Sequence, residues 1–206
     1  MENDRTKGLM LALATFFMWG VFPIFFKLMK DVDAVQILAH RVVWSFVLLL
    51  VFLCFTHRLK NVARLLSTPK IALTLLCTGL LISTNWGVYI YAVNSDQILA
   101  TSLGYFINPL FSVLLGALFL HERLSAAAKL SLLLAFAAIG VQIYALGRLP
   151  IISLVLPLSF AFYGLIRKKV KVPSFEGLFC ETTLMLLPAL AFLIYCALKG
   201  SGAFGF

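Results

Sequence analysis

Long apolar runs, separated by short polar links, make up most of this chain. Seven runs can be marked, with approximate bounds 8–26, 36–55, 71–93, 98–120, 128–146, 150–166 and 177–198. A helix rises about 1.5 Å per residue, so a run of about 20 residues crosses a hydrocarbon core of about 30 Å. Since lipid offers no hydrogen-bond partners, each crossing must be helical. The pattern predicts an all-α polytopic membrane protein, a bundle of seven transmembrane helices.

The fourth run has small and polar residues along one helical face. They recur at every fourth position and are Ala100, Gly104, Asn108, Ser112 and Gly116. Small residues on one face let a second helix approach closely, and the amide of Asn108 near mid-membrane needs a partner that lipid lacks. We therefore expect this helix to pack inward. Asn108 then either binds substrate or holds two helices together.

Composition agrees with a membrane protein. Hydrophobic residues make up 62% of the 206 residues, and charged residues make up 12%, about half the share usual in soluble domains. The net charge of +9 comes from Lys and Arg in short clusters between apolar runs, so we expect no nucleic-acid partner. The four cysteines lie inside apolar runs without CxxC spacing, and we expect neither a metal site nor a cofactor.

The distribution of basic residues predicts the orientation. If the N-terminus is cytoplasmic, the cytoplasmic side carries 12 of the 17 Lys and Arg residues and the outer side carries five. Cytoplasmic loops are enriched in these residues, so this orientation is predicted. The first apolar run lacks a small-residue cleavage site, which favours a retained helix over a signal peptide.

Polar residues in the third predicted helix are candidates for a substrate path. Asn85 and Trp86 are expected to face a cavity, because an amide in mid-membrane needs a partner. Tyr89 lies one helical turn beyond Asn85. The alternative is a role in helix packing, which the small residues Gly79 and Gly87 on a neighbouring face favour.

Charged residues near two helix ends are further candidates. His40 and Arg41 lie just inside the predicted outer end of the second helix, with Trp44 one turn deeper. Arg41 either reaches lipid head groups or contacts a substrate anion, and both interpretations stay open. Glu181 lies at a similar depth in the seventh run. If the halves of the chain are inverted copies, Glu181 marks the inner end of the path and Arg41 the outer end.

The sequence contains no catalytic constellation. The eight acidic residues lie in loops or near predicted helix ends, without a carboxylate pair in mid-membrane. His121-Glu122-Arg123 lacks the second histidine of an HExxH zinc site, and there is no Gly-rich phosphate loop. We therefore expect the protein not to be an enzyme and to have no catalytic residues.

A faint internal repeat links the first and sixth runs. The stretches 15–20 and 159–164 both have a hydroxyl residue, Phe, two variable residues, an aromatic residue and Gly. Because the helices alternate in direction along the chain, the two copies cross the membrane in opposite directions. Inverted repeats are typical of secondary transporters.

Longer motifs indicate a family. The most specific are His40-Arg41-Val42-Val43-Trp44-Ser45 and the stretch SLGYFINPL at 102–110, and the pairs Trp19-Gly20, Asn85-Trp86 and Glu122-Arg123 accompany them. In these motifs the chain resembles RarD-type members of the drug/metabolite transporter superfamily, with its EamA-type repeat. The resemblance implies a ten-helix permease of two inverted five-helix repeats. Residues 1–147 would form the first repeat and 148–206 would begin the second, so we expect a C-terminally truncated fragment.

The resemblance also implies a function. The protein would be a secondary transporter of a bacterial inner membrane that exports small metabolites or drugs by alternating access, in a subgroup linked to chloramphenicol sensitivity. Its partners would be the lipid bilayer and a small-molecule substrate, and a homodimer is one assembly that would complete the path. The alternatives are a membrane-bound lipid-modifying enzyme and a non-transporting membrane fragment. The path candidates are Trp19, His40, Arg41, Trp44, Asn85, Trp86, Tyr89, Tyr105, Asn108 and Glu181.

Overall fold

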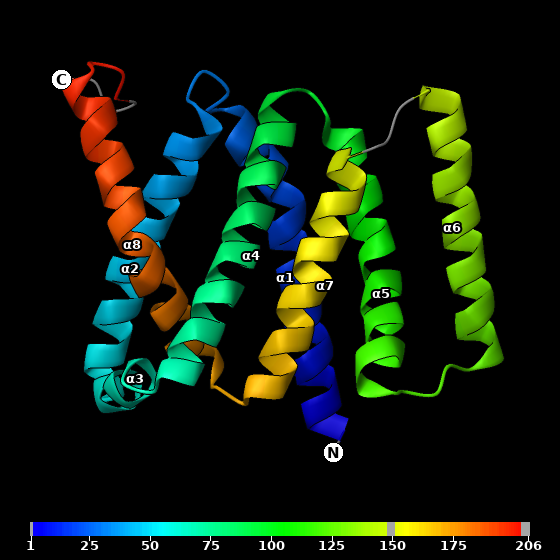
Figure 1. The fold of residues 1–206 in the computed structure, drawn as a ribbon, viewed down its shortest axis with the longest axis horizontal. Coiled ribbons are helices and arrows are strands. Elements are labelled where there is room, and N and C mark those ends of the chain that lie inside the picture. Colours follow the sequence, from blue (N-terminus) through cyan, green and yellow to red (C-terminus); the bar gives the residue numbers. More distant parts are fainter. Residues whose placement is uncertain (1, 148–150, 203–206) are drawn as a thin grey trace.

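The computed structural model describes residues 2–147 and 151–202, and they fold into helices throughout (Figure 1). The helices are α1 Glu2–Lys27, α2 Ala34–Phe55, α3 Leu59–Leu66, α4 Pro69–Asn94, α5 Ile98–Leu120, α6 Ala126–Leu146, α7 Ile151–Val170 and α8 Ser174–Leu198. Seven of these described helices, all except α3, are long and apolar enough to cross a membrane. The predicted all-α bundle of seven spanning helices is confirmed.

The short helix α3 was not expected from the sequence. It lies at the end of the bundle that holds the N-terminus, at the bottom of Figure 1. Lys60, Asn61 and Arg64 make it too polar to span a membrane, whereas Val62 on its other face is buried against Leu53 and other residues of α2, α4 and α8. The amphipathic pattern of α3 therefore covers the end of the bundle.

The small-residue face of α5 packs against α7, its most extensive neighbour. The Ser153 hydroxyl of α7 donates a hydrogen bond of 2.9 Å to the carbonyl oxygen of Ala100. A Cβ atom at Gly104 would lie only 3.3 Å from the Cβ of Leu156 and 3.4 Å from the Cα of Ser153. The predicted inward packing of this helix is thus confirmed, since only small residues allow so close an approach.

The helix α4 is the centre of the bundle. It contacts α1, α2, α3, α5, α7 and α8, more neighbours than any other helix of the described chain. Two of its glycines lie at close crossings: a Cβ at Gly79 would be 3.4 Å from the backbone oxygen of Glu181, and one at Gly87 would be 3.2 Å from Leu38. The small residues predicted to favour packing here do lie at helix contacts.

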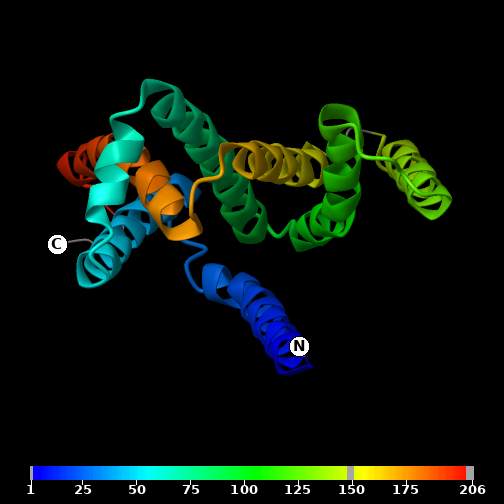
Figure 2. The ribbon, with the colours of Figure 1, turned by 90° about the horizontal axis from the view of Figure 1, so that it is seen from below.

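The helices α1 and α6 lie at the edges of the bundle. Only 6% of the spanning window of each is buried, against 22–39% for the other spanning helices. Figures 1 and 2 show α6 at one end of the molecule and α1 extending away from the others. At the end of α1, Lys27 forms a salt bridge with Asp96 in the α4–α5 connection. The hydrogen bond and charge of Lys27 hold the pKa of the Asp96 carboxyl below its usual value.

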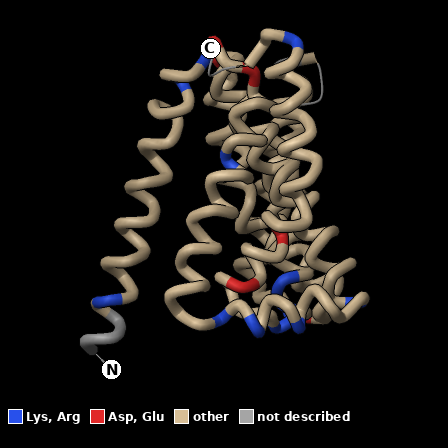
Figure 3. The backbone as a smooth tube through the Cα atoms, turned by 90° about the vertical axis from the view of Figure 1, so that its left-hand side faces the viewer, with Lys and Arg blue, Asp and Glu red and all other residues tan. Residues whose placement is uncertain are grey.

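Basic side chains gather at one end of the bundle. Figure 3 shows most Lys and Arg residues at the end that holds the N-terminus, and few at the end that holds the α1–α2 connection. We call these the N-terminal end and the α1–α2 end. The clustering matches the positive-inside pattern, and the cytoplasmic position of the N-terminus stays a prediction.

The division into two inverted repeats also stays a prediction. The helices α1 and α7, which carry the two copies of the repeat motif, run in opposite directions (Figure 1). The predicted boundary between residues 147 and 148, and the predicted start of the sixth run at 150, fall on 148–150. Those residues lie outside the part of the chain that the structure describes.

Replacing Gly104 by Leu should destabilise the bundle, because the larger side chain has no room between α5 and α7. Overpacking of this kind costs about 1–3 kcal/mol. Gly140→Leu on α6 is the matched control, since no atom lies within 4 Å of a Cβ built there. Thermal unfolding of both purified variants in detergent measures the difference. Equal melting temperatures for the two variants would contradict the packing described here.

Candidate functional site

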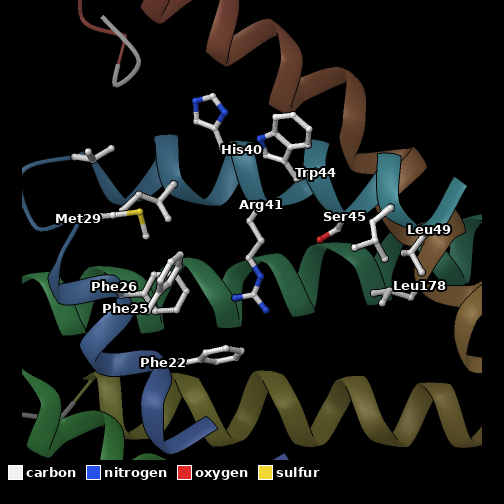
Figure 4. Close-up of a pocket in the computed structure, with 13 residues that line it drawn as sticks. Phe22, Phe25, Phe26, Met29, His40, Arg41, Trp44, Ser45, Leu49 and Leu178 are labelled. Carbon is white, nitrogen blue, oxygen red and sulfur yellow. The ribbon is translucent and has the colours of Figure 1, made fainter. Parts of the chain in front are cut away.

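A pocket of about 660 Å³ lies between α1 and α2 (Figure 4). Its wall is mostly aromatic and aliphatic, with His40, Arg41 and Ser45 as its polar members. The pocket extends from the α1–α2 connection along α2 as far as Leu49, where Leu178 of α8 lies beside it. Its volume and its largely apolar wall are typical of a small-molecule site. The remaining wall residues are Phe22, Phe25, Phe26, Met29, Val32, Ile37, Trp44 and Leu48.

Arg41 is directed into the bundle. Its guanidinium carbon lies 4.0 Å from the ring centroid of Trp86 on α4, a distance at which the cation is attracted to the face of the indole ring. Figure 4 shows the side chain reaching from α2 toward α4, on the same side as Ser45. This contact favours a position inside the bundle over one among the lipid head groups, and a role of Arg41 in binding a substrate anion stays a prediction.

Aromatic rings continue from Arg41 across three helices. Tyr89 and Tyr105 lie near the guanidinium, and their ring centroids lie 5.6 Å apart in an edge-to-face arrangement. Tyr105 also contacts Trp19 of α1, at 6.5 Å between centroids. The structure therefore brings five predicted path residues, Trp19, Arg41, Trp86, Tyr89 and Tyr105, into one connected group.

His40 and Trp44 belong to the pocket but lie on a neighbouring face of α2. Both line the wall, and Figure 4 shows them on the side of α2 that faces away from α4. The spacing of four residues between them places them one above the other on the helix. Three of the ten predicted path residues thus line the pocket, and four more belong to the group of rings that adjoins its wall through Arg41 and Phe26.

Asn85 does not face the pocket, which corrects the expectation from the sequence. Its side chain is 1% exposed. Its Nδ2 donates hydrogen bonds of 2.8 Å to the carbonyl oxygen of Leu156 and 3.0 Å to the hydroxyl of Ser159. Asn85 therefore holds α4 to α7, which is the packing role that the sequence left open.

Asn108 is half-buried in α5. No contact of its side chain with the described residues distinguishes substrate binding from a role in holding two helices together. Its Oδ1 atom is buried without a hydrogen-bond partner among the described residues. It is neither in the pocket wall nor bonded to α7, unlike Ser153 and Asn85. Its place in a substrate path stays a prediction.

Glu181 lies in a separate polar cluster toward the N-terminal end. Its side chain is 1% exposed and accepts hydrogen bonds from the hydroxyls of Thr78, at 2.7 Å, and Tyr163, at 3.3 Å. The Nε atom of Arg167 lies 3.7 Å from its Oε1 atom. A carboxylate at this depth requires such partners, because burying an unpaired charge is very costly. The cluster joins α4, α7 and α8 and is not part of the pocket.

Arg41 and Glu181 hold matching positions in their helices. Each lies seven residues after the first residue of its helix, Ala34 in α2 and Ser174 in α8. Both side chains reach α4, where Trp86 and Thr78 are about two helical turns apart. The structure thus places a cation and an anion beside different turns of α4, and their role as the two ends of an inverted-repeat path stays a prediction.

Sequence reasoning missed several important residues. The α1 part of the pocket wall consists of phenylalanines, which look like lipid-facing residues in an apolar run. Arg167 and Tyr163 were also missed as partners of Glu181. A signal existed for Arg167, because an arginine directly after an apolar run requires a counter-charge when it turns inward.

Comparisons with known proteins point to one family. The profile of the EamA-like transporter family matches residues 6–144. An uncharacterized transporter of Vibrio cholerae is 45% identical over 196 residues, which are 95% of this chain and 65% of that protein. The protein RarD of Escherichia coli is 42% identical over 202 residues, 98% of this chain and 68% of its own length. No solved structure gives a significant match.

A more distant relative carries a functional name. The chloramphenicol-sensitive protein RarD of Pseudomonas aeruginosa is 28% identical over 193 residues, which are 92% of this chain and 64% of that protein. The chain thus spans about two thirds of the length of these relatives.

Removing the Glu181 carboxylate should destabilise the protein strongly, because Arg167 would be left buried without its counter-charge. We expect Glu181→Ala to cost about 3–5 kcal/mol. Glu122→Ala is the matched control, since the pair of Glu122 with Lys168 is exposed and such pairs contribute about 0–1 kcal/mol. Reversible unfolding in mixed micelles, followed by circular dichroism, gives both values. Similar losses for the two variants would show that the Glu181 cluster is not a buried ion pair.

Proposed function

Because this chain belongs to the EamA-like transporter family, we propose that its protein is a secondary transporter that moves a small organic molecule through the pocket between α1 and α2. The observation that carries the proposal is the pocket itself, an apolar cavity inside the spanning region with Arg41 in its wall. The direction that we propose is export of metabolites or drugs.

An asymmetry along the bundle supports transport by alternating access. The pocket extends from the α1–α2 end along α2 as far as Leu49 and Leu178. Beyond its deep end, toward the N-terminal end, an apolar core that includes Leu53 and Leu75 fills the bundle, and the Glu181 cluster lies in the same part of the molecule. A path that is open toward one end and packed at the other is what a transporter needs in either of its two states. In the proposed cycle, the Glu181 contacts separate when the pocket closes.

The proposed setting is the inner membrane of a bacterium, with a cytoplasmic N-terminus. The excess of Lys and Arg at the N-terminal end supports this orientation, and it directs the pocket toward the outer side. Since the chain spans about two thirds of the length of its relatives, transport is proposed for the whole protein. A homodimer also stays a prediction, which the oligomeric state in nanodiscs would test.

Filling the pocket should stop transport. Ser45 lies in the wall beside Arg41 (Figure 4), so Ser45→Phe places a ring where substrate would pass. A steric cost of about 1–3 kcal/mol to substrate in the pocket corresponds to a loss of flux of about five- to 150-fold. Ser131→Phe, on an exposed position of α6, is the matched control and should transport normally.

The measurement uses sealed vesicles with reconstituted protein, loaded with a mixture of amino acids, organic acids and chloramphenicol. Chloramphenicol is included because one relative is named for sensitivity to it. Efflux of at least one compound should exceed that from empty vesicles, and Ser45→Phe should lower it. If no compound leaves faster than from empty vesicles, the chain is better explained as a non-transporting protein or a lipid-modifying enzyme.

A further inference from the structure

We propose that the pocket between α1 and α2 binds a small organic anion, a carboxylate with an aromatic or aliphatic body, and that Arg41 is the residue that binds its charge. This inference rests on the proposed transport function, because it names the substrate class of the same pocket. Three observations carry it: the unpaired charge of Arg41, the position of its donors and the chemistry of the wall.

The charge of Arg41 has no counter-charge within the described chain. The ion pairs there involve Lys27, Arg58, Arg167 and Lys168, and none includes Arg41. Nearby acidic groups are occupied elsewhere: Asp96 pairs with Lys27, and Asp33 accepts hydrogen bonds from backbone N–H groups at the start of α2. A cation inside the spanning region without an anion is unusual, since such residues nearly always pair.

The donors of Arg41 are available to a ligand. No described residue accepts a hydrogen bond from its guanidinium, and its contact with Trp86 is with the face of the indole ring, which is not a conventional hydrogen-bond acceptor. A guanidinium has five N–H donors in a fixed fork, so Arg41 keeps donors for a bidentate pair. A planar carboxylate fits such a pair in both shape and charge.

The wall of the pocket selects the rest of the ligand. Phe22, Phe25, Phe26 and Met29 form the side that faces Arg41 across the cavity (Figure 4). These side chains offer apolar area and ring faces, but no hydrogen bonds. A volume of about 660 Å³ suits a compound of drug or metabolite size. The pocket therefore fits a molecule with one charged end and an apolar body, and favours it over a sugar or a polar zwitterion.

A binding series with a constant body and a varied end group tests the proposal. The probes are 4-phenylbutyrate, its neutral amide and 4-phenylbutylamine, added to the protein in phosphatidylcholine nanodiscs. The readout is built into the chain, because Trp44 lines the pocket and Trp86 contacts Arg41. Phenyl groups do not absorb at the wavelength that excites tryptophan selectively, so the fluorescence change reports binding directly.

We expect the carboxylate to bind at least about tenfold more tightly than the amide, as for a charge-assisted hydrogen bond, and the amine not to bind. Arg41→Gln should abolish this preference and Arg41→Lys should keep part of it. Arg64→Gln removes the same charge from an exposed position of α3 and should change nothing. If Arg41→Gln does not fold, the relative affinities of the carboxylate, the amide and the amine for the wild-type protein test the anion preference by themselves.

Several results would overturn the proposal. They are equal binding of carboxylate and amide, a preference that survives Arg41→Gln, and no response to the carboxylate at millimolar concentration. A fourth is loss of carboxylate binding when phosphatidylglycerol is added to the nanodiscs, which would identify a lipid head group as the anion at Arg41.

The binding series and the flux measurement test the anion site and the transport function separately. Flux of a neutral compound, without preferential binding of the carboxylate, would overturn the anion site and leave transport intact. Binding of the carboxylate through Arg41, without flux of any compound, would contradict transport and leave the site intact.

Discussion

Ionised side chains inside an apolar bundle require compensation from the protein, and this constraint shapes both halves of the structure. Glu181 has full compensation: two hydroxyl donors and the guanidinium of Arg167 surround it, and the surrounding helices are closely packed. Arg41 has only the face of Trp86 and the neighbouring tyrosines. The unsatisfied charge of Arg41 lies in the pocket wall, whereas the satisfied charge of Glu181 lies outside it. The difference between them is the basis of the proposed function.

The helix α4 connects the two halves. Its glycines let α2 and α8 pack closely against it, and Asn85 forms a hydrogen bond to α7. Trp86 contacts Arg41, and Thr78 donates a hydrogen bond to Glu181. A shift of α4 along its neighbours would therefore change both charged groups at once. In lipid, where apolar burial does not drive helix association, such small-residue crossings and polar contacts are what hold helices together. The same contacts that stabilise the bundle thus couple its two ends.

The sequence was sufficient for some of these features, and physical reasons explain the others. Run length and hydropathy predicted the seven spanning helices, and the small face of α5 predicted its packing, because both depend on local pattern alone. Asn85 was expected at a cavity, but a polar residue within a span shows only that a partner is needed, not which helix supplies it. The phenylalanines of α1 and the partnership of Arg167 with Glu181 depend on how distant helices cross, and periodicity within one helix does not contain that information.

Trp86 holds Arg41 inside the bundle. The most direct test of this contact is the coupling free energy between the two side chains. A double-mutant cycle with Arg41→Gln, Trp86→Leu and both changes together isolates this energy from the effects of each side chain alone. Stability measured by reversible unfolding should give a coupling of about 0.5–2 kcal/mol, as for a cation over an indole ring. A coupling of zero would place the guanidinium elsewhere, at the lipid head groups, and would contradict the account.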